Sequence, residues 1–307
     1  MKHYSVLKKE LLDSLNIKED GTYVDATLGY AGDSEEILRK LKRGFLFAFD
    51  QDSEAIEYSQ KKLSEIGQNF KLIHANFTNL KEELLKNNVS QVDGIIFDLG
   101  LSSPQIDNDE RGFTFMKDAP LDMRMDKSKI ETAKDIVNNY ELDKLVDIFF
   151  KYGEEKFSKN IAKGIISKRK EKTITRTFEL VNIIKDSVPS KYFNLNHPER
   201  RIFQAIRIEL NEELKVLENV LPDAINLLSK GGRLSVITFH SLEDRIVKQI
   251  FKKYSEIDRI VKGLKDIPKE YQPLIKLVNK KPILPSIKEI EENSRSKSAK
   301  LRVVERI

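Results

Sequence analysis

The first hundred residues constrain the fold more than any other feature, because short β-rich segments alternate there with segments of helical periodicity. This order is typical of a parallel sheet whose strands are joined by crossover helices, and it predicts a doubly wound α/β domain. The predicted strands are residues 23–26, 45–50, 70–74 and 92–98, and the predicted helices between them are residues 34–41, 54–66 and 80–86.

After Asp98 the alternation stops, and residues 107–197 show helical periodicity instead. Beyond them the chain returns to alternating segments. We therefore expect one α/β domain, formed by residues 1–106 and 198–307, that is interrupted by an inserted helical subdomain at residues 107–197.

The second part of the α/β domain is predicted to begin with a long helix and to end with an edge strand. The predicted segments are a helix at residues 198–228, a turn at Gly231-Gly232, a strand at 233–239, a helix at 242–254 and the edge strand at 301–307.

The composition excludes several kinds of chemistry. The chain has no cysteine, which removes disulfides, thiolate metal sites and thiol nucleophiles. Its four histidines are not spaced to place two ligands on one helix face, so no metal site is predicted. Residues 1–12 mix charged and apolar types without a signal-peptide or membrane-spanning stretch. We expect a cytoplasmic protein with no membrane partner.

Basic residues are concentrated in two places, although the net charge of the 307-residue chain is only +5. Residues 156–176 carry eight Lys and Arg against Glu171 alone, a local charge of +7, and residues 295–302 carry four more without an acidic residue. Such clusters favour binding to a polyanion such as RNA. A solvated helix face in a lysine-rich protein would show the same pattern.

Polar and glycine residues follow four predicted strands, where a doubly wound sheet binds its ligand. The first strand leads into a glycine-containing loop with Ala31, Gly32 and Asp33, and the second ends at Asp50. Phe77 follows the third strand. The fourth ends at Asp98 and is followed by Ser102, Ser103, Pro104 and Gln105.

The nature of these residues indicates S-adenosylmethionine rather than a dinucleotide. The dinucleotide fingerprint G-x-G-x-x-G is absent, and Asp25 and Asp33 would repel a pyrophosphate while suiting a cationic nucleoside. Asp50 lies where an acidic residue meets ribose hydroxyls. Each of three residues also has a purely structural alternative. Asp50 would be a turn residue at a strand end, Phe77 a core aromatic and Asp33 a helix cap.

The fourth strand end is expected to face the reacting methyl group. Methyltransferases that act on exocyclic amines place Asp, Asn or Ser followed by prolines there, and Ser103-Pro104-Gln105 matches this partly. Hydrogen-bond acceptors on the amine make its nitrogen more nucleophilic. Asp98, Ser102 and Ser103 are therefore the candidate catalytic residues. Methylation of cytosine at carbon 5 normally needs a thiolate, which this chain lacks.

At these residues the chain resembles the MraW family, bacterial 16S ribosomal RNA cytosine-N4 methyltransferases. The resemblance begins at His3 and extends to the C-terminus. Its most specific blocks are DLGLSSPQID (98–107), RGFTF (111–115), PLDMRM (120–125), RIFQAIR (201–207) and FHSLEDRIVK (239–248).

The resemblance implies a class I S-adenosylmethionine-dependent methyltransferase, a Rossmann-like sheet with an inserted helical subdomain. It also implies a cytidine substrate in the decoding region of 16S rRNA in the small ribosomal subunit, and it allows a homodimer. One departure is that Asp33 stands where the family usually has histidine. The cofactor contacts that it implies are Ala31, Gly32, Asp33, Asp50, Phe77, Asp98 and Gln105.

Three other functions stay open from the residues. A DNA amino-methyltransferase would share the cofactor domain, a non-catalytic RNA-binding assembly factor would share the fold, and a nicotinamide oxidoreductase would share the doubly wound sheet. The residues of the 120–125 block predict a packed loop with an Asp122–Arg124 ion pair. Residues 241–244 are predicted to form a helix capping box next to His240, which is itself a candidate to contact RNA or cofactor.

Overall fold

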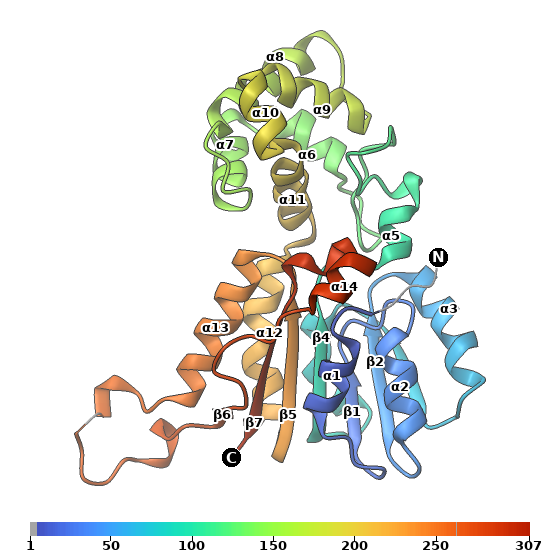
Figure 1. Ribbon diagram of the computed structural model, residues 1–307, viewed down its shortest axis with the longest axis vertical. Helices are drawn as coiled ribbons and strands as arrows, with labels where there is room; N and C mark the ends of the chain where they lie inside the picture. The colour runs from blue at the N-terminus through green and yellow to red at the C-terminus, as the bar shows by residue number, and fades with distance from the viewer. Residues whose placement is uncertain (1–4, 262) are drawn as a thin grey trace. The chain divides into compact units, whose positions relative to one another are not determined.

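The computed structural model describes residues 5–261 and 263–307, so His3, where the family resemblance begins, lies outside them. The chain divides into two compact units (Figure 1). The first unit consists of residues 1–100 and 214–307, and the second of residues 101–213. Each unit has its own hydrophobic core and is described by itself.

The first unit contains a seven-stranded sheet with the order β3-β2-β1-β4-β5-β7-β6. Strands β1 to β5 are parallel, and β7 runs antiparallel between β5 and β6. The strands are β1 (Thr22–Asp25), β2 (Phe45–Asp50), β3 (Phe70–His74), β4 (Val92–Asp98), β5 (Leu228–Thr238), β6 (Ile275–Leu277) and β7 (Lys300–Arg306).

Helices cover both faces of this sheet, because side chains alternate along each strand. Leu46 and Ala48 of β2 pack in a cluster with residues of α1, α2 and α3, whereas Phe47 and Phe49 pack in a cluster with residues of α4, α12 and α13. The helices of this unit are α1 (Lys8–Leu15), α2 (Gly32–Lys40), α3 (Ser53–Ser64), α4 (Leu80–Lys86), α12 (Glu213–Leu227), α13 (Ser241–Ser255) and α14 (Ile287–Glu292).

The α/β prediction is confirmed, and three of the first four predicted strands have the observed bounds. The last strand was wrongly predicted as an edge. β7 lies inside the sheet, and the three-residue strand β6 forms the edge beside it. The predicted turn at Gly231-Gly232 is also wrong, because β5 already starts at Leu228 and contains an irregularity in its pairing with β4.

The helix predicted over residues 198–228 is two helices, α11 and α12. Glu212 interrupts it with a left-handed backbone, φ 53° and ψ 30°. The amide of Glu212 donates to the carbonyls of Ile208 and Glu209, as at an ordinary helix C-terminus. Non-glycine residues adopt this conformation at a cost, so nothing in the residue type signals the break.

The second unit is almost entirely helical and packs around one core that includes Phe149, Ile161, Leu180 and Ile206. No helix in the described parts of the chain is both long and apolar enough to cross a membrane. The helices of this unit are α5 (Ser103–Asp107), α6 (Ala133–Asn139), α7 (Leu142–Lys151), α8 (Ser158–Glu171), α9 (Thr177–Asp186), α10 (Ser190–Asn196) and α11 (Pro198–Asn211).

Candidate functional site

The sheet of the first unit brings three carboxylates to one edge. Asp25, Asp50 and Asp98 are the last residues of β1, β2 and β4, which are neighbours in the sheet and run in the same direction. The register places Asp25 opposite Ala48 of β2 and Ile96 of β4. The three acidic residues predicted from strand ends therefore share the edge at which doubly wound sheets bind ligands.

The loop between β1 and α2 is held against this edge by the Asp50 carboxylate. The amide of Gly29 donates to Asp50 Oδ2 at 2.8 Å, and the amide of Asp52 donates to Asp50 Oδ1 at 2.8 Å. Ala31 ends the loop in a left-handed conformation with φ 57° and is fully buried. Asp50 is thus more than a turn residue, because it fixes the backbone of the loop expected to contact the cofactor.

Asp33 lies inside helix α2 and not at its cap. Ala31 occupies the N-cap position and makes no side-chain cap bond, so the interpretation of Asp33 as a helix cap is wrong. Its side chain is 6% exposed, and its Oδ1 atom has no hydrogen-bond partner in the described structure. The buried oxygen without a partner is what a ligand-binding carboxylate would show before its ligand is bound.

Asp25 also holds the loop between β1 and α2 in place. It is 1% exposed, accepts a 2.7 Å hydrogen bond from the Ser34 hydroxyl and accepts the amide of Thr27 at 3.0 Å. From the sequence, Asp25 was expected only to place a negative charge near the loop. The structure shows that it also ties the end of β1 to the first turn of α2.

Asp98 ends β4 with a free carboxylate oxygen. Its amide donates to the Thr27 hydroxyl at 2.6 Å, while its Oδ1 atom is buried without a hydrogen-bond partner in the described chain. Thr27 was missed by sequence reasoning, because a threonine in a loop gives no signal of its own. Through Asp25 and Asp98, this one residue connects the ends of β1 and β4.

Burial raises the pKa of each of these carboxylates. The pKa of Asp25 and that of Asp50 are each raised to about 6, mainly by desolvation, and the pKa of Asp33 is raised by burial and then by the charge of Asp25. The pKa of Asp98 lies well above its ordinary value because of burial and the neighbouring acidic groups. A cationic ligand would stabilise the ionised forms of these buried carboxyl groups, so this sheet edge suits a positively charged ligand.

Phe77 begins the short turn after β3 and is partly buried. Its ring meets that of Phe97 of β4 edge to face, with centroids 5.4 Å apart and an interplanar angle of 90°. Phe77 therefore packs at the margin of the core. This packing is compatible with the structural alternative, and the predicted contact with adenine remains a proposal.

Ser102, Ser103 and Gln105 belong to the second unit. Ser102 caps helix α5: its Oγ accepts the amide of Gln105 at 3.4 Å, and Gln105 Oε1 accepts the amide of Ser102 at 3.0 Å. Ser103 is the first residue of the helix, and Pro104 follows it. The structure therefore gives Ser102 and Gln105 a local role as a reciprocal cap.

Helix α13 has its capping box one residue earlier than predicted. His240, and not Ser241, is the N-cap: its Nδ1 accepts the amide of Glu243 at 3.4 Å, and Glu243 Oε2 accepts the amide of His240 at 3.2 Å. The Glu243 carboxylate also accepts the amide of Phe239 at 2.8 Å. Histidine is an unusual N-cap residue, which is why the serine appeared the better candidate.

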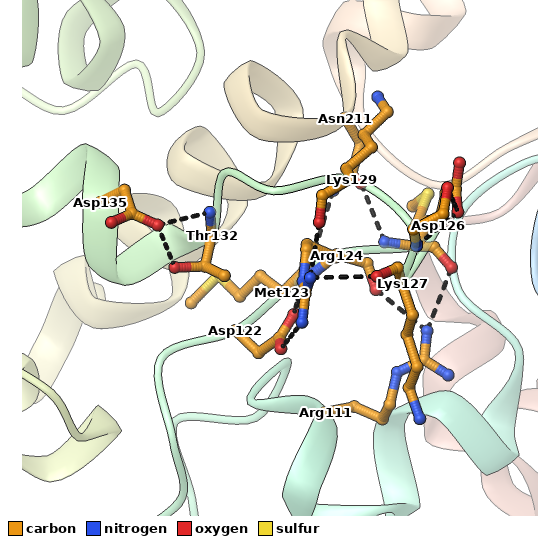
Figure 2. A network of polar contacts seen from close by, with 12 residues as sticks. Arg111, Asp122, Met123, Arg124, Asp126, Lys127, Lys129, Thr132, Asp135 and Asn211 are labelled. Atoms are coloured by element: carbon orange, nitrogen blue, oxygen red, sulfur yellow. Dashed lines mark hydrogen bonds and ion pairs between the residues drawn. The ribbon is translucent and has the colours of Figure 1, made fainter.

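In the second unit, the 120–125 block is a packed loop, as predicted (Figure 2). Arg124 Nη2 lies 2.7 Å from Asp122 Oδ2, which confirms the expected ion pair, and its Nη1 donates to the carbonyls of Lys127 and Lys129. The buried Arg111 donates to the carbonyls of Arg124 and Met125. These contacts make the loop a rigid part of the helical unit.

Asn211 of α11 fixes the same loop from the other side. Its side-chain oxygen accepts the amide of Met125 at 2.9 Å, and its side-chain nitrogen donates to the carbonyl of Met123 at 2.9 Å. Met123 has a positive φ of 59°, a conformation that methionine rarely adopts. The two side-chain bonds hold this residue in place without any contribution from a ligand.

The basic segment 156–176 divides into paired and unpaired cations. Lys168 and Lys172 form ion pairs with Glu171 and Glu179, and Arg169 donates to two backbone carbonyls. Lys159 and Lys163 of α8 are exposed and have no ion-pair partner among the described residues. Only part of the segment predicted to bind a polyanion is therefore available to do so.

Two cations of the second basic stretch share one acidic partner. Lys300 and Arg302 lie on β7, and both pair with the Asp244 carboxylate, at 3.1 and 2.7 Å. These contacts lower the pKa of Asp244 and join β7 to α13. Sequence analysis could not show this, because Asp244 is 56 residues from Lys300.

The strand order and the acidic ends of β1, β2 and β4 define the class of protein: a class I S-adenosylmethionine-dependent methyltransferase. Within this class the chain belongs to the MraW methylase family, whose family model matches residues 1–307. Methylases of this family use S-adenosylmethionine, and the buried Oδ1 atoms of Asp33 and Asp98, which have no hydrogen-bond partner among the described residues, suit its positive charges.

Solved structures with a similar chain path are distant in sequence. An rRNA methylase from Streptococcus thermophilus is 13% identical, with 98% of this chain and 93% of that chain covered and a TM-score of 0.44. An S-adenosylmethionine-dependent O-methyltransferase from Thermotoga maritima is 8% identical, with 100% and 68% covered and a TM-score of 0.43. The family assignment rests on the family match and not on these likenesses.

Proposed function

We propose that this methyltransferase transfers a methyl group to N4 of a cytidine in the decoding region of 16S rRNA, in the small ribosomal subunit. Membership of the MraW methylase family supports this proposal. The observation that carries it is the Asp98 carboxylate, which ends β4 with a buried Oδ1 atom that has no partner in the described structure. An acceptor at this position suits an exocyclic amine.

The bound cofactor would supply an electrophilic methyl carbon on a sulfonium. The loop ending at Ala31 and Gly32, together with Asp33 and Asp50, would hold it, since these residues surround the carboxyl ends of β1 and β2. The Oδ atoms of Asp50 can still accept hydrogen bonds from the ribose hydroxyls, because each carboxylate oxygen can accept more than one hydrogen bond. Phe77 and Gln105 are proposed to complete this set from their positions in the sequence.

Asp98 has the central chemical role in this proposal. Its Oδ1 atom accepts a hydrogen bond from the N4 amine, which localises the lone pair of a nitrogen otherwise delocalised into the ring. When N4 gains the methyl group it must lose a proton, and the raised pKa of Asp98 makes its carboxylate a suitable acceptor. Ser102 and Ser103 follow Asp98 closely in the chain and are proposed to help orient the amine on that ground alone.

The exposed lysines of α8 are proposed to bind the RNA backbone, which makes the helical unit the RNA-binding part of the enzyme. The target cytidine must be unpaired or flipped, because base pairing hides N4. Methylation is expected without a metal ion or a covalent enzyme intermediate.

The test is to incubate the protein with labelled S-adenosylmethionine and unmodified small ribosomal subunits, and then to identify the methylated nucleoside by mass spectrometry. N4-methylated cytidine at one position is the expected product. Duplex DNA serves as the parallel substrate, since its preferential methylation would instead show a DNA amino-methyltransferase. Cofactor binding without turnover on either substrate would favour a non-catalytic assembly factor.

A further inference from the structure

His240 offers a second buried polar atom without a hydrogen-bond partner among the described residues, and it follows the strand next to the one that ends at Asp98. Its Nδ1 accepts the backbone amide of Glu243, so the neutral ring carries its proton on Nε2. Nε2 lies 3.1 Å from Glu243 Oε1 without forming a hydrogen bond to it, and this buried nitrogen has no hydrogen-bond partner among the described residues. A buried donor in this condition is rare and costs free energy.

His240 and Asp98 belong to adjacent strand ends. Asp98 of β4 pairs with Ile237 of β5, and His240 follows β5 directly as the N-cap of the 15-residue helix α13. A side chain at Gly100 would lie 3.5 Å from the ring of Phe239, so the two segments continue side by side beyond the strands. All of these residues lie in the first unit.

Glu243 connects the two side chains electrostatically. Glu243 Oε1 lies 3.1 Å from His240 Nε2. The negative charge of Glu243 is also one of the charges that raise the pKa of Asp98. The carboxylate of Glu243 is 3% exposed and is held by the amides of Phe239 and His240. Among the described residues, two buried atoms therefore lack a hydrogen-bond partner: the donor His240 Nε2, which lies beside the Glu243 carboxylate, and the acceptor Asp98 Oδ1.

We propose that His240 is a specificity-determining residue that donates a hydrogen bond from Nε2 to N3 of the target cytosine while Asp98 accepts one from its N4 amine. This inference rests on the proposed function. Cytosine carries an acceptor at N3 beside a donor at N4, which matches these two protein atoms. Uracil carries the reverse arrangement, a donor at N3 beside an acceptor at O4, and would leave both protein groups without partners.

The test combines a His240 variant with a substrate that lacks the N3 acceptor. His240→Asn retains a good helix N-cap, so α13 should form normally, but its shorter side chain cannot reach the position of Nε2. Small subunits are reconstituted with 3-deazacytidine at the nucleotide that the mapping experiment identifies. The wild-type enzyme should lose about tenfold in kcat/KM on this substrate.

The kcat/KM of His240→Asn on the natural subunit should be about tenfold lower than that of the wild-type enzyme. The 3-deaza substitution should then lower the kcat/KM of this variant by less than about twofold more. His240→Gln, which carries a side-chain N–H donor, should regain part of the lost activity. The matched control is Ser286→Ala, which removes the N-cap bond of α14 in the same unit. Its kcat/KM should fall on the 3-deaza substrate by the same factor as that of the wild-type enzyme.

The proposal is overturned if 3-deazacytidine lowers the kcat/KM of His240→Asn by the same factor as that of the wild-type enzyme, or if it does not lower the kcat/KM of the wild-type enzyme. Cofactor affinity by calorimetry and the melting temperature of each variant separate a folding defect from a loss of base recognition. Absence of N4-methylcytidine in the wild-type reaction is a different result, because it rejects the proposed function before base recognition is measured.

Discussion

Asp50 holds the loop after β1 and is proposed to bind the ribose hydroxyls, and two substitutions there separate these roles. Asp50→Ala removes the acceptor of the Gly29 amide as well as the proposed partner of the ribose hydroxyls. We expect a loss of about 1.5–3 kcal/mol of S-adenosylmethionine affinity, the range for a hydrogen bond that involves a charged group. Isothermal titration calorimetry measures it, and parental affinity in the variant would show that the assignment is wrong.

Asp50→Asn is the matched control for the loop. It retains one carbonyl oxygen that can accept the Gly29 amide, but it loses the negative charge. If Asp50 acts mainly on the loop, this variant should bind the cofactor nearly as well as the parent. If it acts on the ribose, its affinity should fall close to that of Asp50→Ala.

The raised carboxylate pKa values predict a pH dependence of cofactor binding. Asp25 and Asp50 have pKa values of about 6 in the ligand-free protein, so they lose their protons as the pH rises through 6. A cationic ligand binds the ionised form better, and its affinity should increase about tenfold between roughly pH 5.5 and 7.5. Binding should release protons, which calorimetry in two buffers with different heats of ionisation detects.

S-adenosylhomocysteine is the control for this prediction, because it lacks the sulfonium charge and should show a smaller increase. The stability of the free protein should change in the opposite direction. Since these carboxyl groups bind protons more strongly in the folded state, they stabilise it at low pH, and this contribution is lost as the pH rises from about 4 to 7. Equal pH profiles for the two ligands would contradict the electrostatic explanation.

At the scale of the elements, two glycines with positive φ differ in what surrounds them. A Cβ on Gly112 (φ +66°) would collide with the carbonyl oxygen of Pro120 and lie 2.9 Å from the amide of Asp122. A Cβ on Gly231 (φ +78°) would meet no described residue within 4 Å apart from its chain neighbours. Gly112→Ala should therefore destabilise the protein by about 3 kcal/mol, and Gly231→Ala by about 1–2 kcal/mol. Thermal denaturation followed by circular dichroism compares them, and equal losses would contradict the packing argument.

The central strands could be predicted because each is a buried apolar run with a clear end. β6 could not, since its three residues, Ile275–Leu277, include a lysine and lie in a Lys-rich segment. The break at Glu212 also left no signal, because glutamate is a good helix former. In both places tertiary packing decides the structure against weak local preference.

The candidate site was predictable where it depends on strand ends, as for Asp25, Asp50 and Asp98. The residues that support these side chains were not predictable. Thr27 contacts Asp98 from 71 residues away, and Glu243 faces the His240 ring because His240, and not Ser241, is the N-cap of α13. The sequence reports which side chains reach the sheet edge, but the partners that orient them depend on how the elements pack.

At the scale of the whole molecule, the available positive charge is smaller than the sequence suggests. Replacement of Lys159 and Lys163 by alanine should reduce the slope of log K against log salt for RNA binding by about 1.4–1.8, if each contacts one phosphate. Filter binding of small-subunit RNA at several salt concentrations measures this slope.

The control for this prediction uses cations of the same segment that already have partners. Lys168→Ala with Lys172→Ala should change the slope less, because these lysines pair with Glu171 and Glu179. An equal effect of both double variants would mean that the ion pairs do not limit RNA binding.

The interior position of β7 affects how the protein is made. β5 is bonded on one side to β4 and on the other to β7, which consists of residues 300–306. A nascent chain therefore has one side of β5 unpaired until residues 300–306 have been synthesised, and an unpaired strand edge readily pairs with other chains. Release of the polypeptide before β7 is made would expose the edge of β5, so the protein is most prone to aggregate during this stage of its synthesis.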